Sequence, residues 1–212
     1  MNKRLILVPL ALLTLAALAC GSGTTGDGTD NKPALYRENF SNNESGWCVD
    51  SASSSALDYK SGKYVFEVND TEWFVWCNPD ENFDDIHLEV TAENTGDTND
   101  TVFGLMCHFQ EASNDFYYAG LSANGDYTIR LYQDGEDVIL AEGTSDAVDA
   151  NAASYKLGLD CANGDITLYL DGDQIDSASD DTYSSGDIGL FAWTGDDAPA
   201  EIHYDDLVVT AP

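Results

Sequence analysis

The stretch that decides the fold is TVFGLMCHFQEASNDFYYAGLSANGDYTIRLYQDG, residues Thr101–Gly135. Apolar residues alternate with other types over Thr101–Gln110 and again over Tyr127–Tyr132, and an aromatic-rich segment, Phe116–Ser122, lies between them. Alternation with a period of two is typical of a β-strand that buries one face. Aromatic residues also favour strands. The stretch therefore predicts three consecutive strands of one antiparallel sheet.

Two dipeptides predict the turns of this sheet. Asn124-Gly125 is a strong hairpin signal because both residues tolerate the positive φ of a type I′ turn, and Asp134-Gly135 predicts the next turn. The alternation also predicts which side chains share a face. We expect Phe103, Leu105, Cys107, Phe109, Tyr127, Ile129 and Leu131 on one face, and Gly104, Met106, His108, Gln110, Thr128, Arg130 and Tyr132 on the other.

The rest of the chain repeats this pattern. From Leu35 to Pro212, short strand-like runs alternate with turn residues, and no run predicts a helix. This length is sufficient for one domain with its own core. Residues 35–212 are therefore predicted to form a single all-β sandwich or barrel.

The N-terminal residues predict export. A positive segment, Asn2–Arg4, precedes the apolar run Leu5–Leu18, which is too short for a typical membrane span. The small residues before Cys20 resemble the cleavage site of bacterial lipoproteins, in which the cysteine is lipidated. We expect residues 1–19 to be a signal peptide and residues 20–34 to be a flexible tether. The alternative is an ordinary secretory signal in which Cys20 is incidental.

The charge of the chain excludes some classes of partner. The formal net charge is −31, and removal of residues 1–19 would take away Lys3 and Arg4 but no acid, which leaves −33. This charge argues against nucleic acid and against electrostatic binding to anionic lipid. We therefore expect contact with the membrane only through the lipid anchor. Such a surface suits solubility, cation binding or a salty environment. We expect the protein to be a monomer.

Four further cysteines predict two disulfides, since an even number is typical of exported proteins. Three pairings are possible. We favour Cys48–Cys77, because these residues flank tryptophan-bearing segments early in the chain. We favour Cys107–Cys161 because each of these residues lies within an apolar alternating strand.

The order of several segments resembles the concanavalin A-like lectin/glucanase superfamily, close to laminin G-like and 3-keto-disaccharide hydrolase-type domains. The resemblance covers most of the chain after Leu35 and implies a jelly roll of two curved antiparallel sheets. It leaves the function open, because this fold occurs in lectins, hydrolases and interaction modules. The segments are NFSNNESGW (39–47), SGKYVFEV (61–68), WCNP (76–79), DDIHLEVTAENTG (84–96), the stretches 103–127 and 155–175, SGDIGLFA (185–192) and HYDDLVV (203–209).

Candidate ligand-binding residues occupy the outward positions of three predicted strands and the end of a fourth. We expect the outward side chains of Asp85–Ala92, Thr101–Gln110 and Tyr127–Tyr132 to converge on one concave face. Such a groove would offer hydrogen-bonding groups and aromatic rings to a hydroxyl-rich ligand. The alternative is a solvated face on which Arg130 only pairs with Glu89. The candidates are His87, Glu89, His108, Arg130, Tyr132 and Trp193.

The tryptophans refine this prediction. Trp73 and Trp76 are three residues apart and cannot both lie on one face of a regular strand. We expect Trp76, beside Cys77, to be the buried one. Trp193 lies at a strand end next to a loop and is the better candidate for an exposed sugar-stacking ring.

We assign no catalytic residue. The glucanases of this superfamily carry Glu-x-Asp-x-x-Glu on one strand, and the nearest stretch here, His87–Glu93, does not match it. Retaining glycosidases need two carboxyls about 5 Å apart. His87, Glu89 and His108 have the right chemistry for zinc or acid–base catalysis, but no local motif supports such a site. An enzyme of this class would be a sugar-acting hydrolase.

Calcium is the cofactor that the resemblance implies, in a structural role. Its oxygen ligands would come from both ends of the domain if the terminal strands pair. The candidate ligands are Glu38, Asn39, Asp205 and Asp206.

The leading hypothesis is an exported lipoprotein, anchored at the bacterial cell surface, whose non-catalytic domain binds an extracellular glycan or sugar derivative. One alternative is a glycoside hydrolase of the 3-keto-disaccharide type. Another is a structural or protein-interaction module of the laminin G-like kind.

Overall fold

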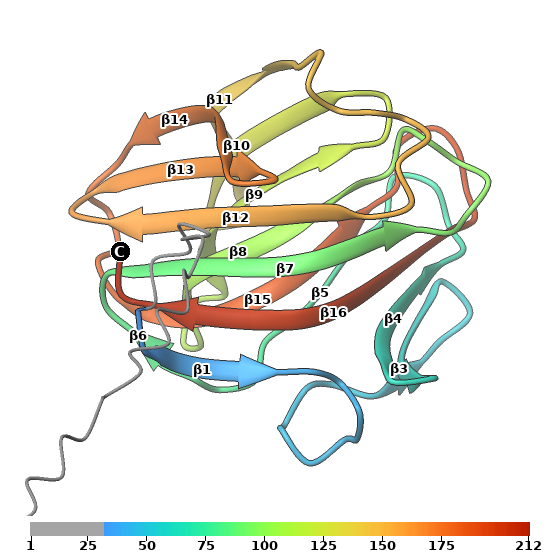
Figure 1. The fold of residues 1–212 in the computed structure, drawn as a ribbon, viewed down its shortest axis with the longest axis horizontal. Helices are drawn as coiled ribbons and strands as arrows, with labels where there is room; N and C mark the ends of the chain where they lie inside the picture. The colour runs from blue at the N-terminus through green and yellow to red at the C-terminus, as the bar shows by residue number, and fades with distance from the viewer. Residues whose placement is uncertain (1–31) are drawn as a thin grey trace, which may run out of the picture. The chain divides into compact units, whose positions relative to one another are not determined.

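The computed structural model describes residues 32–212, which form sixteen β-strands (Figure 1). Within this range no helix is long and apolar enough to cross a membrane. The predicted signal peptide, the lipidation of Cys20 and most of the predicted tether lie outside the described residues. The sixteen strands, both disulfides and the core described below lie within residues 32–212.

Nine strands form one antiparallel sheet, in the order β14-β13-β12-β7-β16-β4-β3-β2, with β1 also paired to β16. Strands from both ends of the domain therefore lie together in this sheet. Their bounds are β1 (Ala34–Glu38), β2 (Asp50–Ser51), β3 (Ser55–Lys60), β4 (Lys63–Val68), β7 (Ile86–Asn94), β12 (Tyr155–Ala162), β13 (Asp165–Leu170), β14 (Asp173–Ser179) and β16 (Ala200–Thr210).

Seven strands form the second antiparallel sheet, in the order β11-β10-β9-β8-β15-β5, with β6 also paired to β15. In Figure 1 this sheet lies behind the first, so that β8 and β15 run behind β7 and β16. The prediction of an all-β jelly-roll sandwich is confirmed. The bounds are β5 (Phe74–Cys77), β6 (Asn82–Phe83), β8 (Val102–Gln110), β9 (Asp115–Ser122), β10 (Asp126–Gln133), β11 (Glu136–Thr144) and β15 (Gly186–Trp193).

The main core lies between the two sheets. Leu88 of β7 and Leu159 of β12 face Leu105 of β8 and Leu121 of β9, and all four side chains are fully buried. A disulfide joins Cys107 of β8 to Cys161 of β12, with the Cα atoms 6.6 Å apart, and so links one sheet to the other. The second disulfide joins Cys48 to Cys77, with a Cα–Cα distance of 5.9 Å. Both predicted pairings are confirmed.

A β-bulge near the end of β8 changes the face to which two side chains point. The pairing of β8 with β9 shifts between Cys107 and Gln110, and His108 has a φ of 51°. A bulge inserts one unpaired residue and so reverses the alternation that follows it. Phe109 therefore lies with the side chains on the outer face of the seven-stranded sheet. The prediction that it shares the inner face with Cys107 is wrong.

The two predicted turns of the central sheet differ from each other. Asp134 and Gly135 both have positive φ, 53° and 83°, as a two-residue hairpin between β10 and β11 requires. In the turn between β9 and β10, Gly125 has a φ of 95° and Asn124 does not have a positive φ. The type I′ prediction for Asn124-Gly125 is therefore wrong, although a turn forms there.

Candidate functional site

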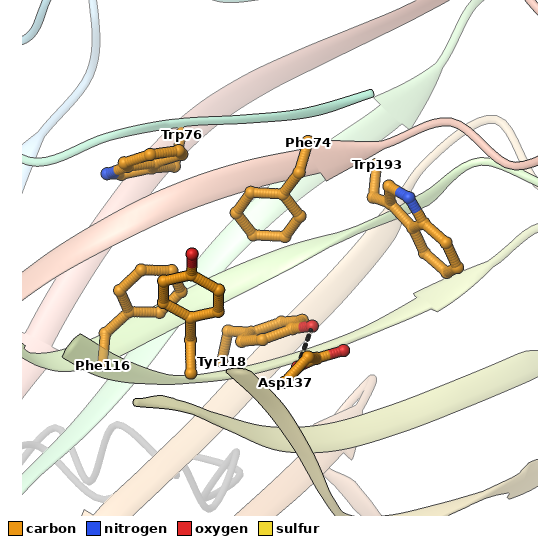
Figure 2. A pocket seen from close by; sticks show the side chains of 7 residues that line it. Phe74, Trp76, Phe116, Tyr118, Asp137 and Trp193 are labelled. Carbon is orange, nitrogen blue, oxygen red and sulfur yellow. Dashed lines mark hydrogen bonds between the residues drawn. The ribbon is translucent and has the colours of Figure 1, made fainter. Parts of the chain in front are cut away.

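A pocket of about 260 Å³ opens on the outer face of the seven-stranded sheet (Figure 2). Six of the seven side chains that line it are aromatic, and the seventh is a carboxylate. We call it the aromatic pocket. Its lining residues are Phe74 and Trp76 from β5, Phe116 and Tyr118 from β9, Tyr132 from β10, Asp137 from β11 and Trp193 from β15.

Strand alternation explains how the pocket forms. In β9, Tyr117 packs into the core between the sheets, whereas Phe116 and Tyr118 face outward. In β5, Phe74 and Trp76 are the outward residues and face the same pocket. Because β5 and β9 lie on opposite sides of β8 and β15, their rings meet over the middle of the sheet.

The aromatic rings pack against one another and form the base of the aromatic pocket. Phe74 stacks on Phe191, with ring centroids 5.2 Å apart and an interplanar angle of 13°. Phe116 stacks on Tyr132 at 5.3 Å and 24°. Tyr118 meets Phe191 edge to face at 5.0 Å. Such pairs add to the stability that burial provides and hold each ring in place.

Trp76 lies in this pocket and not in the core. Its side chain is 36% exposed, and Cys77 next to it is 1% exposed. Cys77 takes the inward position because it forms the disulfide with Cys48, so alternation turns Trp76 outward. The prediction that Trp76 is buried is wrong. Trp73 lies before the start of β5, is 42% exposed and is not among the pocket residues.

A hydrogen-bonded cluster forms the polar edge of the aromatic pocket. The Tyr118 hydroxyl donates to Asp137 Oδ1 at 2.8 Å, the bond drawn in Figure 2. Arg130 Nη1 donates to Asp137 Oδ2 at 2.5 Å, and Nη2 donates to Glu142 Oε2 at 3.1 Å. Arg130 Nε donates to Thr128 Oγ1 at 2.7 Å. Each guanidinium nitrogen thus already has a protein partner.

The electrostatics of this cluster keep Tyr118 neutral and Arg130 charged. Burial raises the pKa of Tyr118 above its ordinary value, and the negative charge of Asp137 adds to this effect. Burial lowers the pKa of Arg130, but the hydrogen bond and charge of Asp137 outweigh burial and raise it overall. The phenol of Tyr118 is therefore a hydrogen-bond donor at neutral pH. The guanidinium of Arg130 forms ion pairs with both Asp137 and Glu142.

A second pocket of about 410 Å³ shares Trp193 with the first. We call it the polar pocket because most of its lining residues carry a hydroxyl or a charged group. It lies over β10 and β11, beside the Arg130 cluster. Its lining residues are Val102, Asp126, Tyr127, Thr128, Arg130, Glu142, Gly143, Thr144 and Trp193.

Three of the six predicted ligand-binding residues come together. Tyr132 and Trp193 line the aromatic pocket, and Arg130 lines the polar pocket. His108 does not join them. The bulge in β8 buries its ring, whose two nitrogens lie 3.2 and 3.1 Å from the backbone oxygens of Tyr183 and Asp84.

His87 and Glu89 lie on the other sheet. The prediction assumed that consecutive strands are neighbours, but the chain crosses from one sheet to the other between β7 and β8. His87 Nδ1 lies 2.6 Å from Asp160 Oδ1, and Glu89 pairs with Lys156 at 2.9 Å. The expected convergence of all these residues on one groove is wrong, and Arg130 does not pair with Glu89.

The sequence prediction missed most of the aromatic pocket. Phe74, Phe116, Tyr118 and Asp137 were not among the predicted ligand-binding residues, although period-two alternation within FVWC and DFYYAG could have placed their aromatic members on one face. The pairing of β5 with β15, which places Phe74 opposite Trp193, joins segments over 100 residues apart. No local pattern encodes that pairing.

The candidate calcium ligands are only partly brought together. Glu38, Asn39 and Asp206 border one surface pocket, which Arg37 also lines and Asp205 does not. Glu38 and Asn39 each accept a hydrogen bond from the backbone amide two residues further on, at 2.6 and 3.1 Å. Within residues 32–212 no group of three or more acidic, histidine or cysteine side chains is placed to hold a metal ion. This donor set does not fit calcium well, and calcium binding stays a prediction.

No protein-family model and no curated protein matches the chain. Solved structures match its fold. The carbohydrate-binding module CBM66 from Bacillus subtilis superposes with a TM-score of 0.65 and 16% identity, over 79% of this chain and 96% of that module. A Bacillus licheniformis β-glucanase gives 0.62 and 14%, over 84% and 97% of the two chains. A Bacillus subtilis protein of unknown function with a galectin-like fold gives 0.64 and 17%, over 84% and 96%. These similarities establish the jelly-roll fold.

Proposed function

We propose that the aromatic and polar pockets form one groove that binds carbohydrate without cleaving it. The observation that carries this proposal is the aromatic pocket itself. Its ring faces suit the C–H surfaces of a sugar, and the adjoining Tyr118, Asp137 and Arg130 can exchange hydrogen bonds with sugar hydroxyls. An apolar pocket with a few convergent polar groups is the usual form of a small-molecule site.

The fold agrees with this proposal. A carbohydrate-binding module and a β-glucanase share the jelly roll, so the architecture accommodates both binding and hydrolysis of sugars. Fold alone does not decide between these activities, so the choice rests on the residues of the groove.

Those residues favour binding over hydrolysis. Glycoside hydrolysis ordinarily needs two carboxyl groups that flank the bond to be broken. Asp137 is the single carboxylate among the residues that line the aromatic pocket, and Asp126 and Glu142 line the polar pocket. The guanidinium of Arg130 holds Asp137 and Glu142, and Asp126 accepts a hydrogen bond from Thr144. Release of shorter sugars from a bound glycan would instead support the hydrolase alternative.

The proposed location is the bacterial cell surface. The two disulfides are typical of exported proteins. Lipidation of Cys20 would tether the domain to the membrane and leave its groove free for extracellular glycans. The sequence predicts this anchor, and mass spectrometry of the membrane fraction would test it.

A glycan array with residues 32–212 tests the binding proposal, with a matched pair of tryptophan variants. Trp76→Ala removes a ring from the aromatic pocket and should weaken binding about tenfold or more, since a central aromatic contact is typically worth over 1 kcal/mol. Trp73→Ala removes a ring of similar exposure outside the pocket and should leave affinity unchanged. Equal losses in both variants, or no binding by the parent protein, would contradict the proposal and favour a protein-interaction module.

A further inference from the structure

The charge of the groove narrows the class of glycan that it can take, provided that the groove binds carbohydrate as proposed. Three carboxylates line the two pockets, those of Asp126, Asp137 and Glu142. Within residues 32–212, Arg130 is the one lysine or arginine that lines either pocket. The wall is therefore net negative, in a chain whose formal charge is −31.

Arg130 is placed to position these carboxylates and not to receive an anion. Its side chain is only 17% exposed, and its three nitrogens donate to Thr128, Asp137 and Glu142. An anionic sugar could reach the guanidinium only by displacing Asp137 or Glu142. The displaced carboxylate would then remain close to the new anion, and like charges brought together in a binding site oppose association.

The polar groups that remain suit hydroxyls. A carboxylate oxygen can accept more than one hydrogen bond, so Asp137 and Asp126 retain capacity beyond the bonds they make to Tyr118, Arg130 and Thr144. A sugar hydroxyl can donate to such an oxygen without bringing any charge. The groove thus presents acceptors for neutral donors, together with ring faces for C–H surfaces.

The arrangement of the pockets sets a minimum length. The two pockets share Trp193, and the ion pair between Asp137 and Arg130 connects the wall of one to the wall of the other. The aromatic pocket provides ring faces on which a sugar can stack. Most of the side chains that can form hydrogen bonds with sugar hydroxyls line the polar pocket. A single sugar in one pocket would forgo the contacts of the other.

We propose that the ligand is an uncharged oligosaccharide of at least two sugar units that runs from the aromatic pocket past Trp193 into the polar pocket, and that the carboxylates around Arg130 exclude anionic glycans. The ligand is thus expected to be a neutral glycan and not a uronate, sialylated or sulfated one.

Binding to an array of neutral oligosaccharides and their uronate and sulfate counterparts tests this inference. The neutral trisaccharide that binds best is compared by calorimetry with its monosaccharide and with the same trisaccharide oxidised to a uronate at one primary hydroxyl. Both should bind at least about tenfold more weakly, since even one lost contact of 1.4 kcal/mol has that effect. Equal or tighter binding of the uronate, or of the monosaccharide, would overturn the inference while the proposed function stands. Absence of binding to every glycan would overturn both.

A charge variant locates the source of the exclusion. Glu142→Gln removes one carboxylate and frees one side of Arg130, so uronate binding should tighten about fivefold at low salt, the effect of one close like-charge contact in water. Asp126→Asn should act in the same direction without altering the Arg130 ion pairs. The control Glu67→Gln breaks a comparable ion pair, with Lys60 on the nine-stranded sheet, and should change nothing. Unchanged uronate binding in both groove variants, with melting temperatures preserved, would refute this role of the carboxylates.

Discussion

The outer faces of the two sheets differ in chemistry, although the same alternation builds them. On the seven-stranded sheet, outward positions carry Phe74, Phe116, Tyr118 and Phe191, which pack into a second apolar cluster. On the nine-stranded sheet, outward positions carry charged pairs such as Lys63–Glu93. One face resembles a core that has been left partly open, and the other is a solvated surface.

This difference teaches where to look for a ligand. Charged pairs on a solvated face contribute little and are common. A contiguous apolar patch on an outer face is a common feature of binding sites, and this is why the proposed groove lies on the seven-stranded sheet. From the sequence, His87 and Glu89 were candidates for the site because histidine and glutamate often occur in binding and catalytic sites. In the structure His87 is instead satisfied by Asp160 within its own sheet.

One test of the comparison truncates an aromatic side chain on each outer face. Phe116 is 2% exposed and stacks with Phe109 and Tyr132, so Phe116→Ala should cost about 3 kcal/mol of the free energy of unfolding. Tyr169, a half-buried ring on the outer face of the nine-stranded sheet, donates one hydrogen bond to Asp160, and Tyr169→Ala should cost about 1 kcal/mol. Urea denaturation measures both. Equal costs would mean that the two outer faces do not differ energetically.

A second test removes the disulfide that joins the two sheets. The disulfide Cys107–Cys161 joins β8 of one sheet to β12 of the other. Replacing both cysteines with serine should lower the free energy of unfolding by about 2–4 kcal/mol, mainly because the unfolded chain gains freedom. Removal of Cys48–Cys77, which closes a shorter loop, should have a smaller effect. Thermal denaturation of the two double variants gives the comparison, and the reverse order would contradict the loop-length argument.

The sequence predicts the fold better than the site because the two depend on different kinds of information. Alternation is local, and it correctly places Ile129 and Leu131 inside and Tyr132 outside. The alternation fails at His108, because a single inserted residue reverses it. The local sequence CHFQ contains no pattern that predicts a bulge.

The site depends on which strands become neighbours. Arg130, Tyr132 and Trp193 lie in one region of the structure, and their role in binding stays a prediction. His87 and Glu89 were misplaced because β7 and β8, though consecutive in sequence, belong to different sheets. Phe74 was missed because its strand pairs with β15, far along the chain. Only the long-range pairing decides these three outcomes.

The smallest expected effect concerns pH and sharpens the contrast between the faces. The hydrogen bond to Asp160 is the main reason that the pKa of His87 lies above its ordinary value, and burial opposes this shift. Glu89, 3.7 Å from Nε2, raises the pKa further. A histidine whose pKa is raised on folding stabilises the protein most below its unfolded pKa, about 6.5. That contribution is lost as pH rises through the folded pKa.

We therefore expect the free energy of unfolding to fall by less than about 1 kcal/mol from this group as pH rises from 6 to 9, because the pair is partly exposed and screened. In His87→Gln this part of the pH dependence should disappear.

Asp160 affects stability at the acidic end of the pH range. Burial raises the pKa of Asp160, but the hydrogen bonds from His87 and Tyr169 outweigh burial and lower it overall, so its contribution is present above its unfolded pKa and is lost as pH falls through the folded pKa. Glycan affinity should not change in His87→Gln, since this residue lies on the sheet opposite the groove. A loss of affinity in this variant would show that the outer face of the nine-stranded sheet takes part in binding. The proposal that only the outer face of the seven-stranded sheet binds the ligand would then be wrong.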